Sequence, residues 1–112
     1  SKRIRSVALN LKALQILSER QLKNDRLVFT IGGSPAKPSY VSKTFKKYVI
    51  KAQINPDLKF HSLRHTFASW LVQIGVSIYE VSKLLGHSDI KVTEIYAHLK
   101  PENLRNAVEL LN

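Results

Sequence analysis

The chain has 112 residues, 44% of them hydrophobic, and a formal net charge of +10, which together indicate one globular domain rather than a disordered segment. It has no cysteine and no methionine. The absence of cysteine excludes disulfides, zinc–cysteine sites and thiol nucleophiles, and it permits a cytoplasmic location. The absence of an initiator methionine favours a piece of a longer protein. There is no signal peptide and no apolar run long enough for a membrane span, so we expect no membrane partner.

The first third of the chain predicts a helix and a small β element. Residues 5–9 and 27–31 are rich in strand-forming side chains, and the strand at 5–9 needs a partner upstream of the chain, so the β element should look incomplete. Asn10 is suited to cap a helix whose leucines continue to Leu22. Glycines and prolines mark residues 32–38 as a loop.

The next helix, which Ser39 can cap, is predicted to have one apolar and one basic face. Its apolar positions are Val41, Phe45, Tyr48, Val49 and Ala52. The opposite face gathers four lysines with no acid among them, namely Lys43, Lys46, Lys47 and Lys51. Such a face is often only solvated, but like charges at this spacing repel, so we interpret the lysines as contacts to DNA phosphates.

The distribution of charge along the chain supports a polyanionic partner. Residues 1–56 carry 12 basic and 2 acidic residues, whereas residues 57–112 carry six of each. A need for solubility alone would not sort charge in this way. Nucleic acid, most simply double-stranded DNA, explains it better.

Two helices are predicted between residues 57 and 86. The first ends at Gly75, since glycine readily takes the left-handed backbone after a helix, and it should bury an apolar stripe made of Leu63, Phe67, Trp70, Leu71 and Ile74. Ser77 and Glu80 form a capping box that opens the second helix, and Gly86 ends it. This second helix should direct four side chains inward, which are Ile78, Val81, Leu84 and Leu85.

Two further helices complete the predicted fold. One begins at Ser88 or Asp89 and continues through Tyr96, and the last begins at Pro101, a residue favoured in a first helical turn. The last helix has an apolar stripe of Leu104, Ala107, Val108 and Leu111. Residues 1–112 are therefore predicted to form a single domain that is mainly helical with a small β element.

Four side chains in the second half indicate chemistry on a phosphate. His61 and Arg64 lie three residues apart at a helix start and so share a face, His87 follows the helix-ending Gly86, and Tyr96 lies on the next helix. Each has an ordinary structural explanation when taken alone. Together they supply hydrogen-bond donors, a fixed cation and a phenol nucleophile, which phosphoryl transfer needs. No acidic cluster is present to hold Mg²⁺, which disfavours a metal-dependent nuclease.

Three segments resemble the catalytic boxes of tyrosine recombinases, the phage-integrase family: residues 60–69 (FHSLRHTFAS), 84–88 (LLGHS) and 93–98 (TEIYAH). The resemblance implies a DNA breaking–rejoining fold and site-specific recombination or integration without a metal or other cofactor. Tyr96 would attack a phosphodiester and form a 3′-phosphotyrosyl link. Arg64 would clamp a non-bridging oxygen, while His61 and His87 would donate hydrogen bonds or handle the nucleophile's proton.

The chain also departs from that family's pattern. The family uses an arginine from an earlier helix, for which we find no counterpart, and a lysine from a β-hairpin, for which Lys2 is a candidate. We therefore expect an N-terminally truncated catalytic domain that by itself binds DNA weakly and is inactive. In the family the C-terminal tail packs on a neighbouring recombinase protomer, which makes residues 101–111 a candidate protein interface.

Three alternatives remain open at this point. Residues 81–96 imitate a helix-turn-helix DNA reader, but His87 stands where an apolar residue is wanted and the second helix is not basic. A type IB topoisomerase shares the tyrosine chemistry. A zinc site is the third alternative, because His61 and His65 are four residues apart, a spacing found in pairs of zinc ligands, although no third ligand is evident.

Overall fold

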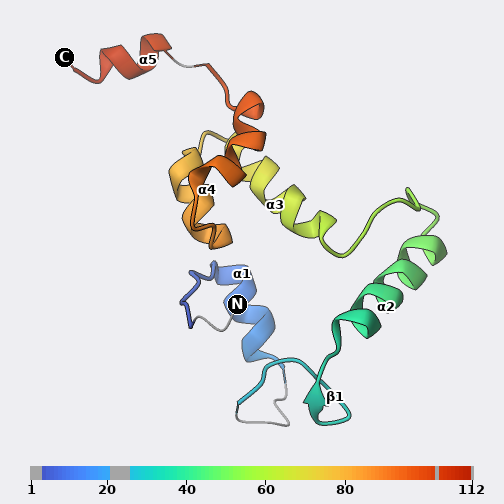
Figure 1. Ribbon diagram of the computed structural model, residues 1–112. Coiled ribbons are helices and arrows are strands. Elements are labelled where there is room, and N and C mark those ends of the chain that lie inside the picture. Colours follow the sequence, from blue (N-terminus) through green and yellow to red (C-terminus); the bar gives the residue numbers. More distant parts are fainter. Residues whose placement is uncertain (1–3, 21–25, 103, 112) are drawn as a thin grey trace. The chain divides into compact units, whose positions relative to one another are not determined.

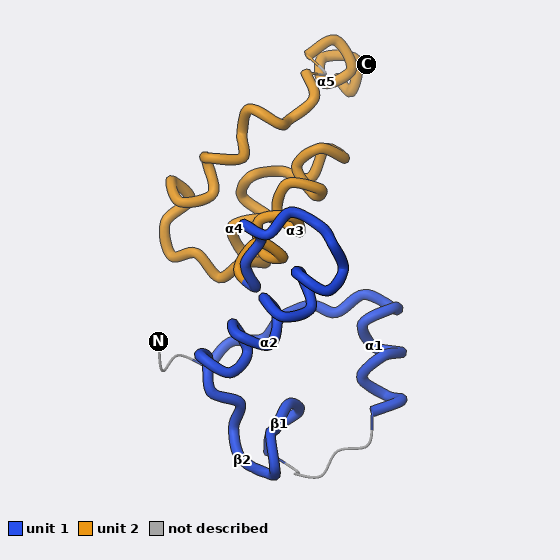
Figure 2. Tube along the Cα trace, turned by 90° about the vertical axis from the view of Figure 1, so that its right-hand side faces the viewer, with its two compact units in different colours: residues 1–60 blue, residues 61–112 orange. Residues whose placement is uncertain are grey.

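The computed structural model describes residues 4–20, 26–102 and 104–111 (Figure 1). Its internal contacts divide the chain into two compact units, Ser1–Phe60 and His61–Asn112 (Figure 2). Lys2, the candidate hairpin lysine, and Leu22 lie outside the described residues. No described helix is both long enough and apolar enough to cross a membrane.

The first helix, α1 (Leu11–Ser18), begins where its cap predicts. The side-chain oxygen of Asn10 accepts a hydrogen bond from the amide of Ala13 at 2.9 Å, which satisfies one of the amides left unpaired at a helix start. The strand predicted at residues 5–9 is wrong, because residues 4–10 form neither helix nor strand. A strand forms only where a neighbouring strand supplies its hydrogen bonds.

The small β element is a two-stranded antiparallel hairpin. β1 (Thr30–Ile31) pairs with β2 (Ser34–Pro35) across two glycines whose φ angles are 58° and 84°. Two central residues with positive φ are what the tightest hairpin turns require. The strand predicted at 27–31 is therefore confined to its last two residues, and its partner comes from the segment predicted as a loop, 32–38.

The long helix of the first unit is α2 (Pro38–Lys51). It begins at Pro38, one residue before Ser39. A proline is tolerated in the first turn because the N–H that it lacks would have no partner within the helix. Val49 is the one residue of this helix that is fully buried. Phe45 packs edge-to-face on Phe60 with ring centroids 5.7 Å apart, so the chain after the helix returns to its apolar side.

The second unit has a core formed by three helices. α3 (Ser62–Gln73), α4 (Ile78–Leu85) and the 3₁₀ helix η1 (Ile90–Leu99) pack on one another pairwise, whereas α5 (Leu104–Glu109) contacts no other described helix or strand. The last helix thus begins three residues after the predicted start at Pro101. The core cluster consists of Ala68, Val72, Val81, Leu85 and Tyr96.

The predicted buried stripe of α3 is wrong. Four of its five members are between 45% and 77% exposed, namely Leu63, Phe67, Trp70 and Ile74. The residues that face α4 and η1 are instead Ala68 and Val72, both completely buried. Their small side chains lie one turn apart and allow close approach of the neighbouring helices, which periodicity alone does not reveal.

The ends of α3 and α4 are formed as predicted. Gly75 and Gly86 follow the two helices with φ angles of 97° and 77°, a conformation that costs other residues free energy. Ser77 caps α4 by accepting a hydrogen bond from the amide of Glu80 at 3.1 Å. Val81 and Leu85 are buried as expected.

Candidate functional site

Tyr96 lies on a helix with three residues per turn. Asp89 caps this helix by accepting a hydrogen bond from the amide of Lys91 at 2.9 Å, so the predicted start is confirmed although the helix is 3₁₀ rather than α. Side chains three residues apart eclipse one another in such a helix. Thr93 and Tyr96 therefore face the same way, and both are buried, with exposed fractions of 0% and 7%.

His87 is held by both neighbouring helices. Its amide donates a 3.0 Å hydrogen bond to the carbonyl of Ser82 across the left-handed Gly86, a closure typical of helix C-termini. Its ring nitrogen Nδ1 lies 2.6 Å from the hydroxyl oxygen of Thr93 on η1. Main chain and side chain together therefore fix where the imidazole lies. Sequence reasoning missed Thr93 as a positioning residue, although its spacing from Tyr96 was visible.

Arg64 connects the start of α3 to the end of α4. Its Nη2 donates a hydrogen bond to the carbonyl oxygen of Leu85, the last residue of α4. Carbonyls at a helix C-terminus lack intrahelical partners and attract cations. A guanidinium carries five N–H donors, so this single bond leaves it able to bind an anion as well.

His65 lies between His61 and Tyr96. Its Nδ1 forms a hydrogen bond with the Tyr96 hydroxyl, and the two ring centroids are 6.0 Å apart. On its other side the ring meets that of His61 edge-to-face at 4.9 Å. Sequence reasoning connected His65 only with zinc. Across residues 4–20, 26–102 and 104–111, no three His, Asp or Glu side chains gather as potential metal ligands.

All four predicted site residues belong to the second unit, and side-chain contacts tie them to the junction of α3, α4 and η1. Arg64 is hydrogen-bonded to Leu85 at the end of α4, and His87 to Thr93 on η1. Tyr96 is hydrogen-bonded to His65 in the first turn of α3. The convergence of His61, Arg64 and His87 on one phosphate stays a prediction.

The basic face of α2 is exposed and lies opposite Val49. Lys43, Lys47 and Lys51 recur every four residues along it, and their side chains are open to solvent. Lys46 is also exposed, but its Nζ donates a hydrogen bond to the carbonyl of Pro56. Three of the four predicted DNA-binding lysines therefore project from α2, while the fourth is engaged by its own chain.

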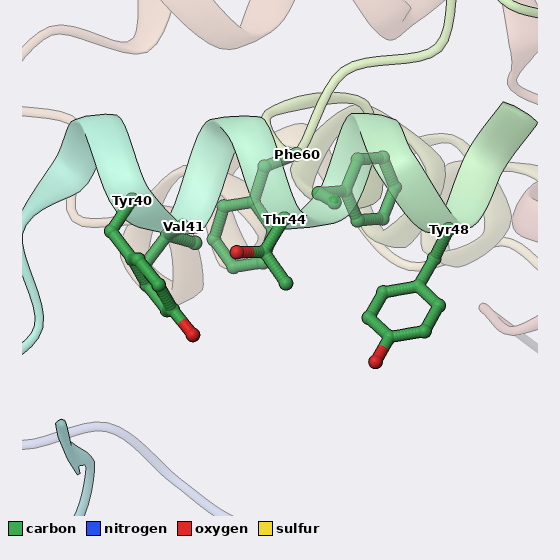
Figure 3. A pocket seen from close by; sticks show the side chains of 6 residues that line it. Tyr40, Val41, Thr44, Tyr48 and Phe60 are labelled. Atoms are coloured by element: carbon green, nitrogen blue, oxygen red, sulfur yellow. The ribbon is translucent and has the colours of Figure 1, made fainter.

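Tyr48 is a member of the predicted apolar face that is open to solvent. It is 59% exposed, and Tyr40, two turns earlier, is 49% exposed. The two tyrosines line a surface pocket together with Val41, Thr44, Phe45 and Phe60. Figure 3 shows both tyrosine hydroxyls directed away from the helix. Basic side chains beside exposed aromatic rings are a combination typical of nucleic-acid-binding surfaces.

Comparison with known proteins gives a consistent result. A family model described as the phage integrase family matches residues 1–103. A tyrosine recombinase XerC-like protein of Caldanaerobacter subterraneus is 46% identical over 81 residues, which is 71% of this chain and 20% of the relative. A tyrosine recombinase of Thermosipho africanus is 37% identical over 96% of this chain and 38% of its own length. The integrase of Salmonella phage P22 is 35% identical over 88% of this chain and 28% of its own length.

The hydrogen bond between His87 and Thr93 can be tested by stability. Thr93→Val keeps the side-chain shape but removes the hydroxyl, and we expect it to lower the free energy of unfolding by about 1 kcal/mol. Urea denaturation followed by circular dichroism measures this. Thr66→Val is the matched control, because Thr66 is exposed and bonds within its own helix to Ser62. Equal effects of the two substitutions would contradict the assignment.

Proposed function

The chain belongs to the phage integrase family, and on this premise we propose that it is the part of a site-specific tyrosine recombinase that cleaves and rejoins double-stranded DNA. It spans between a fifth and two fifths of the relatives described above, so the proposal concerns its share of a larger activity. The observation that carries it is the Tyr96 hydroxyl lying against the first turn of α3, which also bears Arg64 and directly follows His61. A DNA-cleaving enzyme of bacterial or phage origin would act in the cytoplasm.

In the proposed reaction Tyr96 is the nucleophile. Its oxygen attacks a DNA phosphorus, the bond to the 5′-oxygen breaks, and a 3′-phosphotyrosyl link holds the cleaved strand. A 5′-hydroxyl of another strand then attacks that link and releases the tyrosine. Because one phosphoester replaces another at each step, the reaction requires no external energy source and no cofactor.

The other proposed site residues act on charge and protons. Arg64 has a planar guanidinium that can hold two phosphate oxygens at once, and its bond to the carbonyl of Leu85 supports this role by holding the side chain at the end of α4. His61 and His87 donate hydrogen bonds to the phosphate as negative charge develops. Such support is required because a free tyrosine hydroxyl, with a pKa of about 10, is a poor nucleophile at neutral pH.

Covalent trapping on a nicked DNA substrate tests the function. We expect the natural-length protein to form a DNA adduct that survives denaturation, and Tyr96→Phe to abolish it by deleting only the attacking oxygen. Arg64→Lys should slow the reaction by about 10²–10³, because an ammonium cannot replace a bidentate clamp. The 112-residue chain alone should react far more slowly, since the family's first arginine is not assigned within it. Adduct formation by the Tyr96→Phe protein would refute the nucleophile.

The basic face of α2 is the proposed site of binding to the DNA backbone. Changing Lys43, Lys46, Lys47 and Lys51 to Gln should weaken binding and reduce the slope of log K against log salt by about 0.9 for each phosphate that is no longer neutralised. Within this set Lys46→Gln should have a smaller effect than Lys47→Gln, because Lys46 is engaged by Pro56. Fluorescence anisotropy at several salt concentrations measures the slopes. Slopes that do not change would show that the face is only solvated.

The proposed protein partner is another recombinase protomer on the same DNA, contacted through α5. The apolar side chains of this segment are largely exposed, with Leu104 at 75%, Val108 at 65% and Leu111 at 87%. Burying them against a neighbour would remove this apolar surface from water. Removal of residues 101–112 should therefore abolish self-association of the DNA-bound form in sedimentation experiments. The same assembly with and without these residues would contradict the proposal.

A further inference from the structure

We propose that His65 accepts the proton of Tyr96 when the tyrosine attacks DNA, which makes His65 a catalytic residue of this site. The inference rests on the proposed function, because it assigns a partner to the nucleophile named there. A general base must lie within hydrogen-bond reach of the proton that it removes. The Nδ1 of His65 satisfies this requirement, since it is hydrogen-bonded to the Tyr96 hydroxyl.

The other two histidines of the site are placed for different tasks. The Nδ1 of His87 lies 2.6 Å from Thr93 Oγ1, so this nitrogen is bound to η1. The ring of His61 makes an edge-to-face contact with the ring of His65. Among these three imidazoles, the hydrogen bond to the attacking oxygen belongs to His65.

Packing around the phenol holds this hydrogen bond in place. The ring of Tyr96 is 7% exposed and belongs to the core cluster with Ala68, Val72, Val81 and Leu85. A ring fixed in a close-packed core directs its hydroxyl to one place, and that place is beside α3. His65 itself is exposed, so a proton received from the buried phenol can pass on to water.

Proton transfer to His65 accompanies phosphoryl transfer to Tyr96 in the proposed step. The Tyr96 hydroxyl donates its hydrogen bond to His65 Nδ1, and the proton moves to that nitrogen as the bond between the tyrosine oxygen and phosphorus forms. The bond between phosphorus and the 5′-oxygen breaks, and the leaving oxygen takes a proton from water. His65 exchanges its proton with water while the link persists. In the reverse reaction its protonated form donates a proton to the tyrosine oxygen as the 5′-hydroxyl attacks the phosphorus.

The test measures adduct formation by the natural-length protein on the nicked substrate under single-turnover conditions. His65→Ala should lower the rate by about 10²–10⁴, the range typical of general acid–base catalysis, while DNA affinity stays unchanged. Imidazole added to the buffer should restore part of the rate, because the exposed position of His65 is open to a small base. His98→Ala is the matched control, since His98 is an exposed histidine on the same helix as Tyr96 and should leave the rate unchanged.

A second variant separates proton transfer from orientation. His65→Asn keeps a polar side-chain atom near the position of Nδ1, so the phenol keeps a partner, but an amide is too weak a base to accept the proton. We expect this variant to bind DNA normally and to react as slowly as His65→Ala. If His65→Ala fails to fold, the Asn variant decides the question. A wild-type rate for His65→Asn would overturn the proposal, because orientation alone would then suffice.

A modified substrate separates the nucleophile from the leaving group. A bridging sulfur in place of the 5′-oxygen leaves as a thiolate and needs no proton, so it should not rescue His65→Ala. Rescue would place His65 at the leaving group and overturn the proposal, as would a wild-type or faster rate for His65→Ala on the ordinary substrate. If the unaltered protein forms no adduct on either substrate, the proposed function fails instead.

Discussion

The three-residue repeat of η1 is the constraint on which the arrangement of the second unit depends. It directs the hydroxyl groups of Thr93 and Tyr96 to the same side of the helix, where one meets His87 and the other His65. In an α-helix the same two residues would diverge by about 60°, since three residues turn through 300° rather than 360°. Both hydrogen bonds, one from the loop after α4 and one from α3, therefore follow from a single helical geometry.

The parts of this fold that sequence predicts well are those determined by neighbouring residues. Asn10 and Ser77 cap their helices, and Gly86 ends one, through hydrogen bonds and backbone angles that involve residues at most five positions away. The spacing of His61, Arg64, His87 and Tyr96 is likewise visible along the chain itself, which is why the family could be recognised. Recognition of a pattern did not, however, show which side chain meets the tyrosine.

The errors of sequence reasoning concern packing between elements. The apolar stripe that includes Phe67 and Trp70 correctly predicts a helix, but the residues that contact α4 and η1 are the smaller Ala68 and Val72. Tyr48, on the predicted apolar face of α2, is exposed. The partner strand of the hairpin was assigned to a loop. The hydrogen bond between His65 and Tyr96 joins residues 31 positions apart, and no local rule encodes it.

Gly86 shows how the site depends on a residue that has no side chain. Its left-handed backbone closes the end of α4 and fixes the amide of His87 against Ser82, so the direction in which the imidazole leaves the chain is decided one residue earlier. Replacing this glycine would cost about 1 kcal/mol in backbone strain, and this strain would arise at the residue before a catalytic candidate. In a genetic screen for inactive variants, Gly86 would accordingly score beside the candidate site residues, although it has no side chain to contribute.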